Sequence, residues 1–181
     1  MALPIDPAHV RAIAERLVAC RSASPDVVAE TRCARLLAEF LPDVPRGEWP
    51  TADGRPVVWA HRRGRSRRSV VVLGHYDTVG VAEFESLGSS NDLAFDCAAL
   101  RRRLVERAAQ EPDAFGPSAL ADLNREARHP GTWMFGRGAL DMKSGLAAGV
   151  AVLQALARAP APPSAACCSS PRPTKSTIPP A

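Results

Sequence analysis

The segment VVVLGHYDTVG, residues 70–80, constrains the fold more than any other part of the sequence. It begins as an apolar run rich in β-branched residues, which is typical of a buried strand. The run ends at Gly74, and His75 and Asp77 follow two positions apart, so in an extended chain both side chains point the same way. Because loops at the carboxyl ends of strands in open α/β sheets converge on a crevice, the segment predicts a ligand site at such an edge.

Two helices are expected before this segment. Asp6 and Pro7 suit the N-cap and first turn of a helix, and apolar residues then recur at helical spacing up to Val18. A second helix is expected from near Ser24 as far as Pro42, since proline cannot continue a helix. Its apolar side is predicted to consist of Val28, Leu36, Leu37, Phe40 and Leu41.

The rest of the chain predicts strands and helices in alternation. Residues 56–61 and 69–74 are two β-like runs joined by a short polar loop, so we expect a hairpin or two adjacent strands. A helix over 97–110, a short strand over 132–135 and a helix over 142–158 follow. We expect these strands and helices to belong to the α/β fold class.

The composition changes after Ala159. Residues 160–181 consist mainly of Pro, Ala, Ser and Thr and show no periodicity. Such a segment cannot bury enough apolar surface to offset the entropy lost on ordering, so we expect disorder. The predicted domain therefore covers residues 1–159, and residues 160–181 form a tail.

The 181-residue chain is long enough for one domain with a core. It shows neither an export signal nor an apolar stretch long enough to span a membrane, which favours a cytoplasmic protein without a membrane partner. Its five scattered cysteines are then expected to be reduced. The arginine clusters at 61–68 and 101–103 are expected to be solvated surface, because no aromatic platform accompanies them, and nucleic acid is not an expected partner.

Two segments carry residues suited to metal chemistry. His75 could ligate zinc while Asp77 orients its ring, or local hydrogen bonds within a turn could satisfy both. The second segment, GRGALDMKSG over residues 136–145, places Asp141 where a loop enters a helix. A carboxylate there could bridge two cations or could cap the helix, which stabilises it by about 1 kcal/mol. The residues alone leave these alternatives open.

Together, GHYDTVG and WMFGRGALDMKSGLAAGVAVLQAL resemble the co-catalytic zinc metallopeptidases that include acetylornithine deacetylase, succinyl-diaminopimelate desuccinylase, aminoacylase and carboxypeptidase G. Members of this family have a strand ending in GHxDTV and a later GRGxxDMK loop that opens a helix. The segments VGVAEFESLGSSNDLAFD and WMFGRG are most similar to the arginine-utilisation branch, the RocB-like proteins. The resemblance runs from about residue 9 to about residue 158. It implies the first part of a zinc-peptidase-like catalytic domain, with a mixed, mainly parallel sheet flanked by helices.

By this resemblance His75 would be a terminal ligand of one zinc ion, and Asp141 would bridge two zinc ions. Asp77 would serve catalysis by fixing the His75 ring and tuning its basicity. The implied reaction is hydrolysis of an amide bond next to a carboxylate by zinc-bound water, with a small peptide or an N-acyl amino acid as substrate. A homodimer is implied only for the intact protein.

The resemblance also implies residues that this sequence lacks. The family has a Glu-Glu pair after the next strand, one acting as general base and one as metal ligand, and later a further acidic ligand and a histidine. Here the last acidic residue is Asp141. Read in a shifted frame on plausible codons, the tail can spell Leu-Leu-Phe-Leu-Ala-Pro-Thr-Asp-Glu-Glu. We therefore expect an inactive, C-terminally truncated fragment with an out-of-frame tail.

Two other functions stay open. A non-catalytic domain could keep the scaffold and bind a partner or one metal ion weakly. A small arginine-rich nucleic-acid binder would require an affinity that falls steeply with salt. In any of these, a sheet without its later strands would expose an apolar edge, which favours aggregation.

Overall fold

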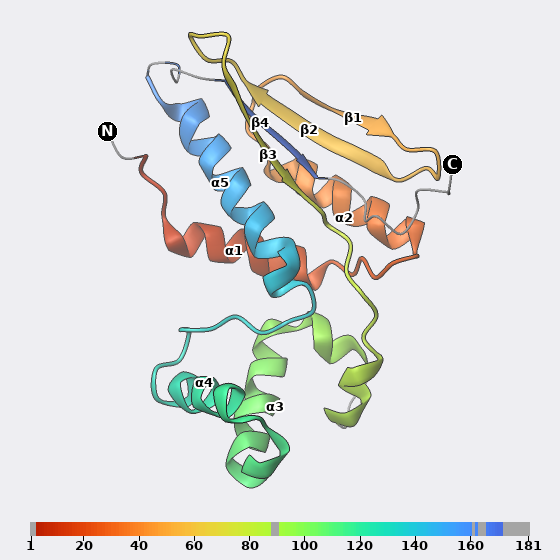
Figure 1. Ribbon diagram of the computed structural model, residues 1–181, viewed down its shortest axis with the longest axis vertical. Helices are drawn as coiled ribbons and strands as arrows, with labels where there is room; N and C mark the ends of the chain where they lie inside the picture. Colours follow the sequence, from red (N-terminus) through yellow and green to blue (C-terminus); the bar gives the residue numbers. More distant parts are fainter. Residues whose placement is uncertain (1–2, 88–90, 161, 163–165, 172–181) are drawn as a thin grey trace.

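A four-stranded sheet with helices packed against one of its faces forms the larger part of the molecule (Figure 1). The computed structural model describes residues 3–87, 91–160, 162 and 166–171. The helices are α1 (Pro7–Ala19), α2 (Val27–Phe40), α3 (Cys97–Gln110), α4 (Pro117–Arg128) and α5 (Ser144–Arg158). The strands are β1 (Arg46–Pro50), β2 (Pro56–Arg62), β3 (Ser69–Gly74) and β4 (Ala166–Pro171). Short 3-10 turns cover Ala82–Leu87, Asn91–Phe95 and Pro112–Ala114, and a π turn over Ala139–Lys143 precedes α5.

Aspartate side chains cap the two N-terminal helices. In α1 the carboxylate of Asp6 accepts a hydrogen bond from Ala8 N at 2.9 Å, as the Asp6-Pro7 pair predicts. Asp26 caps α2 in the same way, accepting from Ala29 N at 3.0 Å. These caps fix where each helix begins.

The buried side of α2 differs from the prediction at its first turn. The prediction that Val28 lies on the apolar side of the helix is wrong, because its side chain is 75% exposed. The residues that α2 buries are Ala29, Glu30, Cys33, Ala34 and Leu37. Most of these side chains are small, which lets α2 pack closely against β2.

The sheet is mixed, with the strand order β1-β2-β4-β3. β1 pairs antiparallel with β2, and β2 pairs antiparallel with β4, whereas β3 and β4 are parallel. The predicted mixed sheet flanked by helices is confirmed, although only one of the three pairings between described strands is parallel. The prediction that strands over 56–61 and 69–74 form a hairpin or lie adjacent is wrong, because β4 lies between them.

β4 lies within residues 160–181, for which the composition predicts disorder. The structure differs at residues 166–171, whose backbone pairs with β2 on one side and with β3 on the other. Pairing on both sides satisfies the backbone hydrogen-bonding groups whatever the side-chain pattern. The composition of a segment therefore does not predict such pairing. Residues 161, 163–165 and 172–181 lie outside the described residues, and a domain boundary at 159 stays a prediction.

Three further segments depart from the predicted pattern. β1 is short and polar, and it forms through its pairing with β2. α4 buries only Leu123 and Glu126 among its residues, so its apolar periodicity is weak. The short strand expected over 132–135 is wrong, since the structure has irregular backbone there.

The core lies between one face of the sheet and the helices α1, α2 and α5. It consists of Ile13, Ala14, Leu17, Cys33, Ala34, Leu37, Leu41, Val58, Ala60, Tyr76, Leu146, Ala147, Val150 and Leu153. On β2 the buried residues alternate with half-buried ones, so β2 turns one face to these helices. On the opposite face Trp49 and Val71 remain 60% and 58% exposed.

The segment Ala139–Arg158, which contains α5, is the one described helix long and apolar enough to cross a membrane, with a mean hydropathy of 1.2 over the best window. Its residues Leu146, Val150 and Leu153 belong to the core. A core helix passes the same test of length and composition, so this property is weak evidence for a membrane span.

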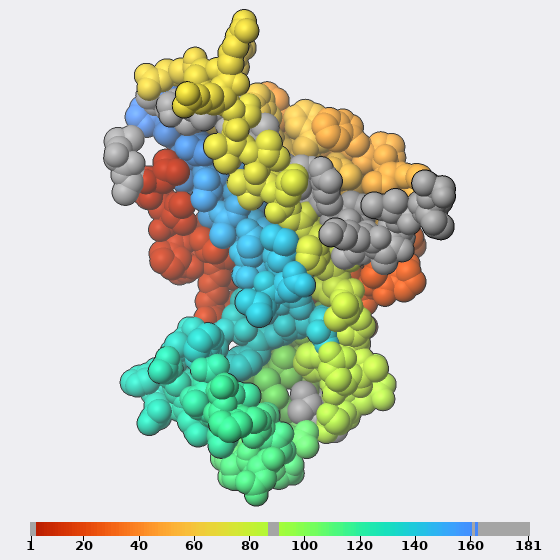
Figure 2. Space-filling model, in the orientation of Figure 1, coloured from red at the N-terminus to blue at the C-terminus, as the bar shows by residue number. Residues whose placement is uncertain are grey.

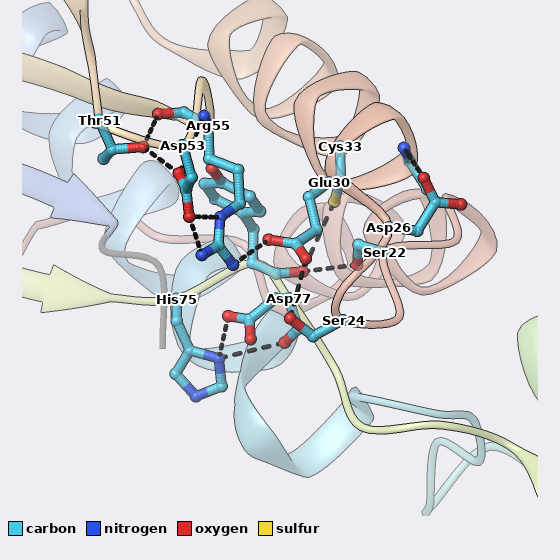
Figure 3. Close-up of polar contacts among 12 residues, drawn as sticks. Ser22, Ser24, Asp26, Glu30, Cys33, Thr51, Asp53, Arg55, His75 and Asp77 are labelled. Atoms are coloured by element: carbon cyan, nitrogen blue, oxygen red, sulfur yellow. Dashed lines mark hydrogen bonds and ion pairs between the residues drawn. The ribbon is translucent and has the colours of Figure 1, made fainter. Parts of the chain in front are cut away.

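A buried ion pair joins α2 to the turn between β1 and β2 (Figure 3). Arg55 is 1% exposed, and its Nη1 donates to Glu30 Oε2 at 3.0 Å while its Nε donates to Asp53 Oδ2 at 2.8 Å. Glu30 is fully buried, and its other oxygen accepts from Ser24 Oγ at 2.9 Å. Both charges of the pair are therefore compensated inside the protein.

The helices α3 and α4 form a small separate lobe around the carboxylate of Glu126 (Figure 1). Glu126 is fully buried and pairs with the Arg101 guanidinium. It also accepts hydrogen bonds from Gly131 N at 2.7 Å and from Trp133 N at 2.9 Å. Burial raises the pKa of Glu126, but these three donors outweigh it and lower the pKa to about 2. The irregular segment after α4 is thus held by one side chain.

Candidate metal centre

The candidate centre lies where β3 ends. β3 pairs in parallel with β4 up to Gly74, which lies opposite Pro171, so both strands reach the same edge of the sheet. His75 follows β3 directly, and Asp141 lies in the π turn that leads into α5. The three residues predicted as a site, His75, Asp77 and Asp141, are therefore brought together at the carboxyl edge of the sheet.

His75 and Asp141 are in direct contact. His75 Nε2 lies 2.8 Å from Asp141 Oδ1, a hydrogen bond in which the ring donates to the carboxylate. The Asp141 side chain is 82% exposed, whereas that of His75 is 25% exposed. The alternative in which Asp141 caps the following helix is not what the structure shows, because α5 has no side-chain cap.

Asp77 holds the other side of the His75 ring (Figure 3). His75 Nδ1 donates to the Asp77 carbonyl oxygen at 3.1 Å and lies 3.2 Å from Asp77 Oδ1. The Asp77 side chain is 2% exposed, and its Oδ1 makes no hydrogen bond to any described residue. The 3.2 Å contact is therefore electrostatic. A buried carboxylate oxygen without a hydrogen bond is costly unless a cation is near, which suits the edge of a metal site.

The two carboxylates also affect the protonation of His75. Burial lowers the pKa of His75, but the hydrogen bond to Asp141, the Asp77 carbonyl and both carboxylate charges outweigh burial and leave the pKa raised. Each ring nitrogen faces an oxygen atom, Nδ1 that of the Asp77 carbonyl and Nε2 that of the Asp141 carboxylate. Because Nδ1 is held by Asp77, Nε2 is the nitrogen that faces Asp141 and the solvent side of the site.

The GRGALDMKSG loop is held in place by its glycines and by Lys143. Gly138 has a φ of +79°, and a Cβ there would lie 2.5 Å from Thr78 Cγ2, so only glycine allows this close approach. Lys143 is fully buried, and its Nζ donates to the Cys20 carbonyl at 2.7 Å. Burial lowers the pKa of Lys143. The lysine of the motif thus ties the loop to the end of α1, a role that its sequence position did not reveal.

Replacing Gly138 by alanine should destabilise the protein by about 1–2 kcal/mol more than replacing Gly54 by alanine. Both glycines have positive φ, +79° and +86°, but a Cβ at Gly54 would meet nothing within 4 Å. The difference between the two variants in urea unfolding therefore isolates the clash with Thr78. Equal costs for the two variants would show that the loop yields without strain.

A cavity of about 670 Å³ opens beside these residues. His75, Asp77 and Asp141 line it, together with Ser24 and Arg137, neither of which was predicted as a site residue. The Arg137 guanidinium lies over the Phe84 ring at 5.1 Å. Ser24 comes from a distant part of the chain, and no spacing rule could have found it.

The donor set fits part of a zinc site. Imidazole nitrogen and carboxylate oxygen are both zinc ligands, and His75 Nε2 and Asp141 Oδ1 are close enough to share one ion. Among the described residues there is no group of three or more His, Cys, Asp or Glu side chains that could hold a metal ion. Catalytic zinc generally has three protein ligands, so these residues alone do not complete such a centre.

Comparison with known proteins supports the expected resemblance. No family model matches the sequence. Over 90 residues, 50% of this chain, the sequence is 38% identical to Protein RocB of Bacillus subtilis (strain 168), and the match covers 13% of RocB. The chain is thus a homologue of RocB over half its length and spans a small part of that protein.

Two solved structures share the fold. The chain superposes on Dug1p, a di-peptidase from Saccharomyces cerevisiae, with a TM-score of 0.56 at 15% identity, covering 90% of this chain and 31% of that chain. It superposes on Sso-CP2, an M20 family metallo-carboxypeptidase from Sulfolobus solfataricus, with a TM-score of 0.56 at 13% identity, covering 92% of this chain and 30% of that chain. The chain therefore has the fold of part of such a peptidase.

Proposed function

Because this chain is a partial homologue of RocB with the fold of part of an M20 metallopeptidase, we propose that it is the N-terminal part of a zinc-dependent amidohydrolase or peptidase domain. The observation that carries the proposal is the 2.8 Å contact between His75 Nε2 and Asp141 Oδ1. It joins the two motif segments at the edge of the sheet where ligands bind in such folds.

Each of the three residues has a proposed role. His75 would hold a zinc ion through Nε2, and Asp141, whose Oδ1 lies beside that nitrogen, would supply a carboxylate shared between two zinc ions. Asp77 fixes the His75 ring through Nδ1 and raises the basicity of Nε2. Bound zinc would supply a water activated for attack on an amide carbonyl. The chain's own residues orient the ligands and shape the cavity.

As a 181-residue chain the protein is proposed to be inactive. Its last acidic residue is Asp141, so it carries no glutamate that could act as the general base after β4. The parallel pairing of β3 and β4 supports a specific position for the general-base glutamate that this sequence lacks, since the chain leaves β4 at the edge where His75 lies. In the shifted frame, Asp-Glu-Glu would fall at positions 174–176, just after β4.

The gene sequence decides the frame hypothesis. The codons for residues 162–166 should contain a place where one insertion or deletion opens a long frame that encodes the Glu-Glu pair and the later ligands. If no such change restores a long open frame, the tail is native sequence and the frameshift is refuted. The proposal for the metal residues does not depend on this outcome.

The substrate class is proposed from the relatives. A small peptide or an N-acyl amino acid fits a cavity of about 670 Å³, and the compared structures are a di-peptidase and a metallo-carboxypeptidase. The likeness to RocB supports a role of the intact protein in arginine utilisation. A cytoplasmic location, with no nucleic-acid or membrane partner, is part of the same proposal.

Zinc binding should be weak and should depend on His75. In calorimetry with zinc chloride, the His75→Ala variant is expected to bind zinc at least about tenfold more weakly than the parent chain, because it loses a direct ligand. The matched control is His129→Ala, whose exposed histidine lies in the loop after α4. Neither parent nor variants should hydrolyse dipeptides or N-acyl amino acids with added zinc.

The same measurements distinguish the proposed function from the main alternative, a non-catalytic domain that keeps the scaffold. The lack of a group of three ligands among the described residues favours it. If that domain binds a partner and no metal ion at this site, His75→Ala would leave zinc affinity unchanged. Turnover of any of these substrates by the parent chain would instead refute the proposed inactivity.

A further inference from the structure

Two cysteines meet where the end of α1 packs against α2. Cys20 is the C-cap residue of α1, and its half-buried side chain packs against the core. Cys33 lies in the middle of α2 and is fully buried in the same core. The Cys33 thiol donates a hydrogen bond to the Cys20 sulfur. The fold therefore places two free thiols in direct contact within the described part of the chain.

Polar groups surround the two thiols, although they lie in the core. Cys33 Sγ lies 3.9 Å from the Tyr76 carbonyl oxygen, which also accepts from Ser22 Oγ at 2.6 Å (Figure 3). Lys143 Nζ donates to the Cys20 carbonyl at 2.7 Å. Figure 2 shows the turn into α5 and the chain after β3, in light blue and yellow-green, side by side. Lys143 and Tyr76 belong to these two segments, and both are fully buried against the thiols.

The contact makes one of the two thiols the better nucleophile. The hydrogen bond from Cys33 lowers the pKa of Cys20 to about 7, although burial raises it. The positive charges of Lys143 and Arg32 act in the same direction as the hydrogen bond, and the negative charge of Glu39 opposes them. The same hydrogen bond and burial raise the pKa of Cys33. Because the thiolate is the reactive form of cysteine, Cys20 reacts first.

We propose that Cys20 and Cys33 are a redox-active pair, which a peroxide converts to a disulfide. The Cys20 thiolate attacks one peroxide oxygen, the O–O bond breaks, and the hydroxide that leaves takes up a proton to give water. Cys20 is then a sulfenic acid. The Cys33 sulfur attacks the Cys20 sulfur, the S–O bond breaks, and the second hydroxide leaves as water with the Cys33 proton. Two thiols are oxidised by two electrons, and hydrogen peroxide is reduced to two water molecules.

The disulfide would form beside the candidate metal centre without being part of it. Tyr76 lies between His75 and Asp77 in the chain, and the turn that ends in Lys143 carries Asp141. The cavity at His75 is lined by other described residues and by neither of the two cysteines. The redox proposal therefore goes beyond the proposed hydrolase function and does not depend on it.

Peptide mapping of the parent chain tests the pairing without any variant. Folded, metal-free protein is treated with a stoichiometric amount of hydrogen peroxide, blocked with iodoacetamide and digested with trypsin. Cleavage after arginine places Cys20 in residues 17–21 and Cys33 in residues 33–35, and neither peptide holds another cysteine. We expect these two peptides to be joined, with the loss of two hydrogen atoms. Residues 17–21 recovered unlinked, or joined to a peptide with a different cysteine, overturn the proposal.

Variants test the role of each sulfur. In Cys33→Ala the sulfenic acid on Cys20 should persist, and dimedone should trap it on residues 17–21. In Cys20→Ala, Cys33 should be oxidised at least about tenfold more slowly than in the parent, because the nucleophile is missing. The matched control is Cys97→Ala, which should form the disulfide as the parent does. Cys97 is also half-buried, but burial raises its pKa to about 11.

The order of reactivity can also be measured in the parent chain, so a variant that circular dichroism shows to be unfolded does not decide the question. At pH 7 iodoacetamide should alkylate Cys20 at least about tenfold faster than Cys97, because far more of Cys20 is thiolate. Equal rates at the two cysteines, or dimedone found on Cys97 and absent from Cys20, overturn the proposal.

Discussion

Replacing Arg55 by alanine is expected to lower the free energy of unfolding by about 3–5 kcal/mol, which is a large part of the stability of a domain this size. The change removes the donors that compensate the fully buried Glu30 carboxylate (Figure 3). It also releases Asp53 in the turn between β1 and β2. Urea unfolding followed by circular dichroism measures the loss.

Two companion variants make this result interpretable. Arg65→Ala, in the exposed loop before β3, removes an arginine without a buried partner and should change stability by less than about 0.5 kcal/mol. The double variant Glu30→Leu, Arg55→Met should recover much of the loss, since an apolar pair can replace a buried ion pair. A loss below about 1 kcal/mol for Arg55→Ala would mean that water reaches Glu30.

Replacing Glu126 by alanine should destabilise the α3–α4 lobe by about 3–5 kcal/mol at neutral pH. The variant leaves Gly131 N, Trp133 N and the Arg101 guanidinium without their shared acceptor. The lobe's amides, measured by hydrogen exchange, should lose protection before those of the sheet. Glu106→Ala, an exposed glutamate on α3, is the matched control.

The effect of Glu126 should also depend on pH. Its pKa in the folded protein is about 2, below the ordinary value of 4.5, so the folded state favours the charged carboxylate. The stabilisation is therefore complete above about pH 4.5 and is lost as the pH falls toward 2. The difference in stability between parent and variant should shrink over this range. A difference that stays constant down to pH 2 would contradict the assignment.

The helices and buried strands were predictable because local signals and burial agree in them. The Asp6 cap and the apolar period that follows it give α1, and the periodicity of 97–110 gives α3 with its observed bounds. The two β-branched runs give β2 and β3. In each case the residues that favour the element are also the ones that the fold buries or pairs.

The predictions that differ from the structure concern segments whose conformation depends on distant parts of the chain. β1 and β4 are strands because neighbours pair with their backbones, which the polar sequence of β1 and the composition of the tail do not signal. Val28 is exposed because it lies on the side of α2 opposite the buried Leu37, and the packing of α2 against β2 decides which side is buried. Residues 132–135 are irregular because Glu126 holds Trp133 N.

The candidate site likewise contains residues that the sequence predicts and residues that it does not. The pairing of His75 with Asp77 follows from their spacing at a strand end, and the motif likeness adds Asp141. Ser24 and Arg137 join the cavity wall only through the fold, and the burial of Lys143 depends on the position of α1. Sequence patterns report residues that lie near one another along the chain, or motifs already known. Ser24 meets neither condition, and although Arg137 and Lys143 belong to the GRGxxDMK motif, their contacts depend on the fold.

The position of β4 also bears on how the chain folds. β4 is the last of the four strands in chain order, yet it occupies an inner place between β2 and β3. Until it inserts, β2 and β3 cannot be joined in one sheet, and the hairpin of β1 and β2 has nothing to extend it. To pair β4 with β2 and β3, the chain must close the long segments between these strands and lose conformational entropy. It loses this entropy before the contacts that offset it have formed, so folding is slow. During synthesis, β4 can pair with β2 and β3 only after residue 171 has left the ribosome, so the apolar β3 lacks this partner until then.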